Sequence, residues 1–192
     1  CSTGAILQAA REVGWQALGI DLNGSAVKIA RARGLAAMEG YFPEDIPSSA
    51  GSFRAITMLD VLEHAEDPVG LLVSVTRHLV PGGVLGVQVP NFNSLLIQIE
   101  GVRNNNICHG HWSYFTPQTL IKVASEAGLE LLSIETIISE IDRVRAYPAK
   151  QVAEAARLLT GRNVEFTDID HRWVHEHLLG YKIFGMFALP RT

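Results

Sequence analysis

Three short stretches of this 192-residue sequence combine residue types that suit the binding of a small molecule. Residues 1–4, Cys-Ser-Thr-Gly, place small side chains directly before a helical pattern, so a ligand can approach free backbone amides at the positive end of a helix. Asp21 closes the next apolar run, about 20 residues on, where a carboxylate can accept hydrogen bonds from both hydroxyls of a ribose. Residues 60–64, Asp-Val-Leu-Glu-His, follow a further apolar run. Each stretch alone also fits a helix cap or a solvated loop, but together the turn, the acid and their spacing indicate a bound nucleoside.

The turn at residues 1–4 lacks the features of a phosphate site. Its sequence, continued by Ala-Ile, has neither the second and third glycines that bring a pyrophosphate close nor the Gly-Lys-Ser/Thr of a phosphate loop. A nucleoside without phosphates therefore fits better than a dinucleotide. A nicotinamide-dependent oxidoreductase stays as an alternative, because dinucleotide enzymes share the same arrangement of turn and acid.

Three histidines near the C-terminus invite a metal-site interpretation. His171 and His175 share one face of a helical pattern, and His177 follows. No cysteine lies nearby, and the pattern is polar all round, which favours a solvated helix face. The sequence therefore predicts no metal site.

The composition limits the class of protein. With 47% hydrophobic residues, a net charge of −4 and two cysteines, the chain suits one globular domain over residues 1–192 and argues against nucleic acid as a partner. Two cysteines also exclude a disulfide-rich scaffold and favour the cytoplasm, and no signal peptide is visible. The longest uncharged stretch, residues 79–99, contains prolines, glycines and asparagines, so we expect a turn, a buried strand and a loop there, and no membrane helix.

The elements that must position these residues alternate along the chain. The pattern predicts an α/β fold with a mostly parallel sheet, helices on both faces, and the last two strands paired antiparallel at an edge. A helical insertion is expected at about residues 139–180, either as a lid or as a dimer surface. Helical patterns cover residues 5–13, 23–33, 67–79, 116–127 and 148–159, and strand patterns cover 16–21, 35–42, 53–59, 84–89, 129–138 and 181–189.

Four segments, taken in order, resemble the motifs of class I S-adenosylmethionine-dependent methyltransferases. They read CSTG from residue 1, GID from 19, FRAITMLDVLEHAEDP from 53 and LVPGGVLGVQVPN from 79. The resemblance covers about residues 1–138 and the final strand. It implies a Rossmann-like sheet with an antiparallel edge strand, S-adenosylmethionine as cofactor and methyl transfer as the activity. Ser2, Tyr41 and Arg54 depart from the family pattern.

The same resemblance assigns cofactor roles to single residues. Residues 1–4 would line the methionine part, Asp21 would hold the ribose hydroxyls, and the leucine after it would flank the adenine. The ends of the next two strands would meet the adenine and pass beneath the methionine. Core packing is the alternative for the apolar members Leu22, Met58 and Leu59. The side chains so assigned are Cys1, Ser2, Thr3, Gly4, Asp21, Leu22, Gly40, Tyr41, Met58, Leu59 and Asp60.

A second, narrower resemblance points to the base. The segment HGHWSYFT at residues 109–116, followed by TLIKVASEAGLELLSIE, resembles sugar C-methyltransferases and small methyltransferases of surface-saccharide and quinone pathways. In the sugar enzymes the second histidine, here His111, is the proposed base, but their helper residues correspond to Cys108 and Gly110. O-methylation with His111 as base is therefore expected, with His109 and His64 ranked after it as catalytic candidates. Capping of the loop is the alternative role for His109 and His111.

These observations lead to one expected function and one expectation about the chain itself. We expect methyl transfer from S-adenosylmethionine to a small hydroxylated or sugar-derived acceptor, by a protein that forms a homodimer. A non-catalytic methyltransferase-like binding domain is the main alternative. Because the cofactor turn begins at Cys1, the first and central strand of the sheet is missing, and we expect the natural polypeptide to extend upstream.

Overall fold

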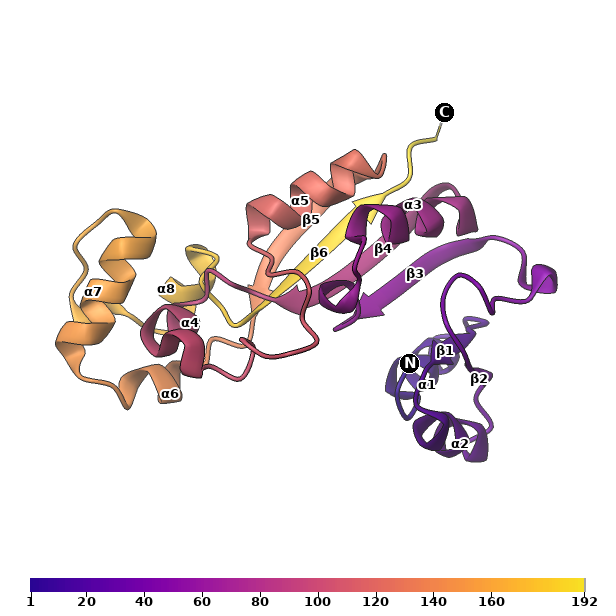
Figure 1. Cartoon of the computed structure of the whole chain (residues 1–192), viewed down its shortest axis with the longest axis horizontal. Coiled ribbons are helices and arrows are strands. Elements are labelled where there is room, and N and C mark those ends of the chain that lie inside the picture. The colour runs from indigo at the N-terminus through magenta and orange to yellow at the C-terminus, as the bar shows by residue number, and fades with distance from the viewer. Residues whose placement is uncertain (192) are drawn as a thin grey trace. The chain divides into compact units, whose positions relative to one another are not determined.

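The computed structural model describes residues 1–191, which divide into two compact units (Figure 1). The first unit comprises Cys1–Gly51 and the second begins at Ser52. Each unit contains a hydrophobic core of its own. The prediction of a single domain stays a prediction.

The first unit alternates two helices with two short strands. Its elements are α1 (Ala5–Glu12), β1 (Gly19–Asp21), α2 (Gly24–Ala32), β2 (Ala37–Glu39) and the 3-10 turn η1 (Ser48–Ala50). The strands pair in parallel, with Asp21 opposite Glu39 at their carboxyl ends. α2 begins directly after Asn23, whose side chain accepts hydrogen bonds from the amides of Ser25 and Ala26. The core of this unit is formed by Leu7, Val27, Ala30, Leu35 and Ala37.

The second unit contains a four-stranded sheet in the order β3-β4-β6-β5. Its strands are β3 (Phe53–Leu59), β4 (Leu79–Pro90), β5 (Glu130–Ile137) and β6 (Lys182–Ala188). β3 and β4 are parallel, whereas β6 is antiparallel to both of its neighbours. The predicted antiparallel pair at the edge is therefore β5 with β6, and the antiparallel strand lies one position in from that edge.

Two helices that pack on this sheet begin where the sequence predicts. α3 (Pro68–His78) follows the Asp67 cap, and α5 (Pro117–Glu126) follows a reciprocal capping pair of Thr116 and Thr119. The two helices contact each other and lie on the same side of the sheet (Figure 1). The 3-10 turn η2 (Leu62–His64) connects β3 to α3.

The remaining helices of the second unit enclose a separate core. They are α4 (Leu95–Glu100), α6 (Ile141–Arg145), α7 (Ala149–Thr160) and α8 (His171–Glu176), with the 3-10 turns η3 (Gly101–Arg103) and η4 (Phe166–Asp168). Leu95, Leu96 and Ile99 of α4 are buried in this core together with Val144 and Val152. The predicted helical insertion at 139–180 thus corresponds to α6, α7 and α8.

Residues 79–99 fold differently from the expectation of turn, strand and loop. The β3–β4 register passes from Phe53 opposite Leu79 to Ala55 opposite Val84, so residues 80–83 bulge out within β4 and do not form a turn before it. The expected loop contains α4 instead, which Ser94 caps through the amide of Ile97. Because α4 is buried on nearly all sides, its sequence shows no polar face that would mark a helix.

The predicted α/β class, with parallel strand pairs and one antiparallel strand, is confirmed. The strands of residues 1–191 form two separate sheets, one of two strands and one of four. Within the same residues, no helix combines the length and the apolar character needed to cross a membrane.

Candidate active site

The turn at residues 1–4 has a backbone that depends on glycine. Gly4 caps α1 at φ +91°, in the left-handed region, and a Cβ atom there would lie 2.5 Å from Leu35 Cδ1. Ser2 also has a positive φ of 48°. The small residue types in this turn therefore meet a steric requirement of the first unit as well as the expected approach of a cofactor.

Asp21 lies at the end of β1 and is held by donors from the same turn. Its Oδ2 atom accepts hydrogen bonds from the amino group of Cys1 (2.8 Å) and the amide of Ser2 (2.7 Å), and Oδ1 accepts one from the amide of Asn23 (2.9 Å). Burial opposes ionisation, but these hydrogen bonds outweigh it and lower the pKa of Asp21 to about 2. The carboxylate is thus ionised, and Oδ1, with one amide donor among the described residues, suits a ribose hydroxyl.

The other predicted adenine contacts of the first unit differ in exposure. Leu22 and Tyr41 are both exposed. The alternative interpretation of Leu22, that it packs in the core, is therefore wrong. Gly40 donates its amide to the carbonyl of Asp21, and the amide of Tyr41 is held by Asp45 Oδ2 at 2.7 Å. These contacts fix the backbone after β2 and leave the Leu22 and Tyr41 side chains available to a ligand.

In the second unit the predicted cofactor residues lie at the end of β3. Met58 is buried, which agrees with core packing, and Leu59 is half-buried. Asp60 adopts a positive φ of 54°, and its carboxylate contacts Lys182 Nζ at 2.7 Å and Gln88 Nε2 at 3.2 Å. These contacts tie the chain after β3 to β4 and β6.

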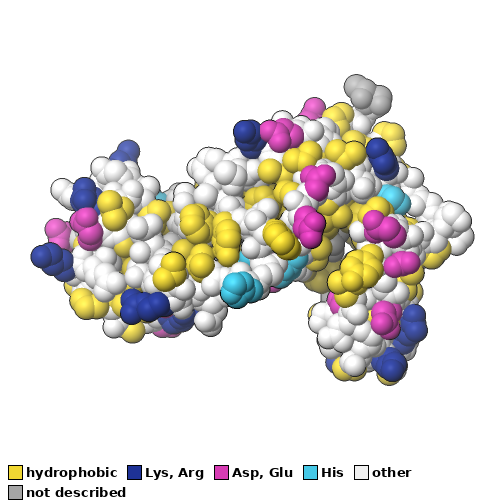
Figure 2. Space-filling view, viewed as in Figure 1, with side chains coloured by type: hydrophobic (Ala, Val, Ile, Leu, Met, Phe, Trp, Pro, Cys, Tyr) yellow, Lys and Arg dark blue, Asp and Glu magenta, His cyan; other side chains and the backbone are white. Residues whose placement is uncertain are grey.

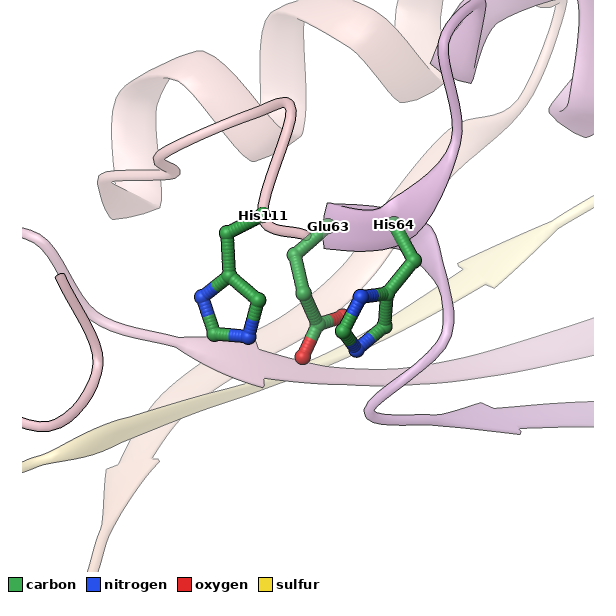
Figure 3. A group of neighbouring side chains, drawn as sticks. All are labelled: Glu63, His64 and His111. Atoms are coloured by element: carbon green, nitrogen blue, oxygen red, sulfur yellow. The ribbon is translucent and has the colours of Figure 1, made fainter. Parts of the chain in front are cut away.

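Directly after Asp60 the structure brings together Glu63, His64 and His111, which we call the Glu-His-His group (Figure 3). Glu63 and His64 belong to η2, whereas His111 comes from the loop before α5. The amides of Trp112 and Ser113 donate to the Glu63 carbonyl at 2.8 and 3.2 Å, which brings the two segments together. The two imidazole rings meet edge to face with centroids 4.8 Å apart.

Backbone carbonyls determine which ring nitrogen of each histidine carries the proton. His64 Nδ1 lies 2.7 Å from the Gly110 carbonyl oxygen and His111 Nδ1 lies 3.0 Å from that of Asn106. Because a carbonyl oxygen only accepts, each Nδ1 must donate, and Nε2 of a neutral ring keeps a free lone pair. In each histidine this Nε2 lone pair can bind a proton or a metal ion.

The surroundings of the Glu-His-His group favour neutral side chains. Glu63 is 1% exposed, and burial, reinforced by Asp60, raises its pKa. Its Oε2 atom has no hydrogen-bond partner among the described residues. Burial also lowers the pKa of His111, and the charges of His64 and Lys182 act in the same direction. The hydrogen bond to the Asn106 carbonyl and the charge of Asp60 act in the opposite direction. At neutral pH His111 is therefore an uncharged base.

The same three side chains form a set that could hold a metal ion. One oxygen or nitrogen from each lies within 4.8 Å of the others, and carboxylate with imidazole is an ordinary ligand set for zinc or iron. The sequence considered a metal only at His171, His175 and His177. It missed the Glu-His-His group because His111 lies far along the chain from Glu63 and His64.

Other histidines named by the sequence lie outside this group. His109 is exposed. His171 and His175 contact Ser139 Oγ (2.6 Å) and Thr136 Oγ1 (3.1 Å). The prediction that their helix is polar all round is wrong, because Val174 is fully buried and faces the second core. These two histidines therefore attach α8 to the end of β5, and His177 stacks on Trp173.

Aromatic side chains border the Glu-His-His group. Tyr114 lies 6.2 Å from the His111 ring and 5.5 Å from Phe92, between ring centroids, and Trp112 is 67% exposed. Figure 2 shows hydrophobic and histidine side chains next to one another on the surface of this unit. An acceptor with a flat apolar ring would find contact area beside the base.

Comparisons with known proteins show the family of this chain. A family model described as a methyltransferase domain matches residues 1–134. The chain therefore belongs to this methyltransferase family, within the class I superfamily whose cofactor is S-adenosylmethionine. The cofactor predicted from the sequence is thereby confirmed.

Individual relatives are distant. The chain is 29% identical over 150 residues to the ubiquinone biosynthesis O-methyltransferase of Methylococcus capsulatus, covering 71% of this chain and 63% of that protein. It is 29% identical over 147 residues to the enzyme of the same name from Thiobacillus denitrificans, covering 68% and 62%. The chain thus spans less than two thirds of these relatives. The fold also matches a SAM-dependent methyltransferase from Archaeoglobus fulgidus, with a TM-score of 0.66, 16% identity, and coverage of 98% and 82%.

Proposed function

We propose that the protein transfers a methyl group from S-adenosylmethionine to a hydroxyl of a small acceptor, with His111 as the base. The observation that carries this proposal is the orientation of His111. Its Nδ1–H is bound to the Asn106 carbonyl, so Nε2 of the neutral ring is free to accept the hydroxyl proton. The burial that lowers the pKa of His111 keeps the ring in this form at neutral pH.

The residues of the chain contribute binding, orientation and proton transfer. S-adenosylmethionine, when bound, supplies a methyl group on a positively charged sulfur. Asp21 would hold the ribose hydroxyls of this cofactor through its free acceptor capacity. Orienting an acceptor against such a methyl group supplies about 7–11 kcal/mol of barrier lowering, and a base adds about 10²–10⁴-fold in rate. His64 and Glu63 lie next to His111.

Two observations support a hydroxyl on a ring-bearing acceptor. Tyr114, Phe92 and Trp112 offer aromatic contact area close to His111. The curated relatives are named ubiquinone biosynthesis O-methyltransferases, which supports O-methylation over C-methylation. The net charge of −4 favours a small molecule over a nucleic acid. A homodimer and a cytoplasmic location stay predictions from the sequence.

The cofactor half of the proposal is tested by calorimetry with S-adenosylhomocysteine. We expect the wild type to bind, and Asp21→Asn to bind about 10-fold to 100-fold more weakly, because hydrogen bonds to a charged group are lost. Glu12→Gln, an exposed change at the far end of α1, should bind as the wild type does. Absence of binding by the wild type at high micromolar ligand would contradict the proposal.

The transfer half is tested with labelled S-adenosylmethionine and a panel of catechols, phenols and sugars. We expect the label to appear on an acceptor hydroxyl, with ring-bearing acceptors preferred. Cofactor binding without transfer to any member of the panel would favour the alternative of a non-catalytic binding domain.

A further inference from the structure

A buried side chain outside the Glu-His-His group leads by successive hydrogen bonds to His111. Asn104 is 1% exposed and lies between α4 and the loop that carries the base. Its Oδ1 atom accepts from the amide of Asn106 at 2.9 Å, and its own carbonyl accepts from the amide of Ile107 at 2.9 Å. These bonds fix the turn that presents the Asn106 carbonyl to His111 Nδ1 at 3.0 Å.

The Asn104 side chain also binds Glu100, at the end of α4, and Tyr181, directly before β6. Its Nδ2 atom donates to Glu100 Oε2 at 2.7 Å, and Oδ1 also accepts from the Tyr181 hydroxyl at 3.0 Å. Both atoms of the amide are thus used, and the flipped orientation of this amide would lose the bonds with the Asn106 amide and with Glu100. Only one arrangement of the Asn104 side chain satisfies its neighbours.

Glu100 connects this amide to the insertion at 139–180. Its carboxylate, 9% exposed, accepts from Arg143 Nη2 at 3.0 and 3.2 Å and from the Tyr147 hydroxyl at 2.9 Å. Arg143 also lies over the ring of Tyr181, 5.9 Å from its centroid. The carboxylate therefore accepts from Arg143 of α6, from Tyr147 between α6 and α7, and from Asn104.

We propose that Asn104, anchored by Glu100, is a positioning residue that sets the tautomer and orientation of His111 through the Asn106 carbonyl. The insertion that supplies Arg143 and Tyr147 thereby supports the base, which is a role distinct from a lid or a dimer surface. The proposal rests on the proposed function only where it concerns catalysis. The tautomer of His111 is a property of the protein alone.

The direct test measures the ring nitrogens of His111 by ¹⁵N NMR on the full chain, with the signal identified by its loss in His111→Gln. In the wild type we expect the neutral ring to carry its proton on Nδ1. In Asn104→Ala the ratio of tautomers should shift about five-fold towards Nε2–H, because the turn at Asn106 no longer holds its carbonyl in place. An unchanged ratio in a folded Asn104→Ala protein would overturn the proposal.

A matched control separates positioning from general stability. Tyr147→Phe removes another hydrogen bond to the same carboxylate without touching Asn104 or Asn106. We expect it to lower Tm but to leave the His111 tautomer as in the wild type. An equal change of the tautomer in both variants would mean that any loosening of this region has the same effect, and would overturn the specific role of Asn104.

If Asn104→Ala fails to fold, a pair of variants that exchanges the hydrogen-bond donor and acceptor between residues 104 and 100 provides the test. Asn104→Asp alone places a second carboxylate beside Glu100, whereas Asn104→Asp with Glu100→Gln restores a hydrogen bond with donor and acceptor exchanged. The double variant should regain the wild-type tautomer that the single variant loses. Failure of the double variant to regain it, while folded, would contradict the proposal.

Turnover then connects the position of the ring to catalysis. Asn104→Ala should lower kcat about 10-fold to 100-fold with little change in KM or in S-adenosylhomocysteine affinity, because displacement of a base slows the chemical step. If the tautomer shifts but kcat does not, the positioning role stands and the proposed role of His111 as base fails. If neither changes, the positioning role itself fails.

Discussion

Burial shifts the pKa values of Glu63 and His111 in opposite directions, each towards the neutral form of the side chain. It raises the pKa of the carboxyl group and lowers the pKa of the imidazole. The Oε2 atom of Glu63 has no hydrogen-bond partner among the described residues, and a neutral His111 can accept a proton. At the scale of single residues, the same desolvation therefore favours the neutral imidazole of His111 and disfavours an ionised carboxylate at Glu63.

Replacement of Glu63 by glutamine should stabilise the protein at neutral pH. The unfolded chain ionises Glu63 near its ordinary pKa, whereas the folded protein holds the proton to higher pH, so stability falls as pH rises between those two values. Glutamine does not ionise, so the Glu63→Gln protein does not lose this stability as pH rises. The substitution should raise the free energy of unfolding by about 1–3 kcal/mol at pH 7.5, with little difference at pH 4. Thermal denaturation at both pH values measures this.

The exposed neighbour Glu66 provides the matched control for this change. Glu66→Gln should leave Tm unaltered at both pH values. A Glu63→Gln protein less stable than the wild type at pH 7.5 would contradict the account and would indicate that a bound cation or another partner holds the ionised carboxylate.

His64 should influence the pH dependence of turnover. Since only neutral His111 accepts a proton, the rate should rise with pH through a midpoint below the ordinary histidine pKa of about 6.5. The charges of His64 and Lys182 lower the pKa of His111, whereas the charge of Asp60 raises it. His64→Gln removes one of the charges that lower this pKa, so the midpoint should move to higher pH. His109→Gln should not move it, and a downward shift in His64→Gln would contradict this electrostatic explanation.

At the scale of elements, the sequence predicted those parts that local residue types determine. β3 has the predicted bounds, and α3 and α5 begin at their aspartate or threonine caps followed by proline. α4 could not be predicted, because a helix buried on nearly all sides shows no amphipathic pattern. The length of β4 was also missed, since the Pro-Gly-Gly segment that usually ends an element here bulges from a continuing strand.

The turn of the first unit should tolerate no side chain at Gly4. Gly4→Ala combines a left-handed backbone with a Cβ position 2.5 Å from Leu35 Cδ1, whereas Gly14→Ala has a similar φ of +79° and no atom within 4 Å. Gly14→Ala should cost about 1–2 kcal/mol from backbone strain alone, and Gly4→Ala more, with loss of S-adenosylhomocysteine binding. Denaturation and calorimetry measure both, and equal costs would show that the close approach does not matter.

At the scale of the whole molecule, the candidate residues of each unit could be named from their chemistry, but their contacts could not. Asp21 and His111 could be named because their types and local motifs carry the signal. The contact of Glu63 with the His111 segment could not, since the amides of Trp112 and Ser113 that bind the Glu63 carbonyl lie far along the chain. The support of His111 by Asn104 was hidden for the same reason, because hydrogen bonds between distant segments leave no periodic pattern.

The central claim, that His111 is the base of a methyl transfer, is tested most directly by single-turnover kinetics. Labelled S-adenosylmethionine, an accepted hydroxylated acceptor and the wild type should be compared with His111→Gln and with His109→Gln, whose exposed side chain lies outside the Glu-His-His group. The account predicts that His111→Gln slows transfer by about 10²–10⁴-fold with cofactor affinity retained, and that His109→Gln reacts at the wild-type rate. A His111→Gln protein that transfers the methyl group at the full rate would contradict it.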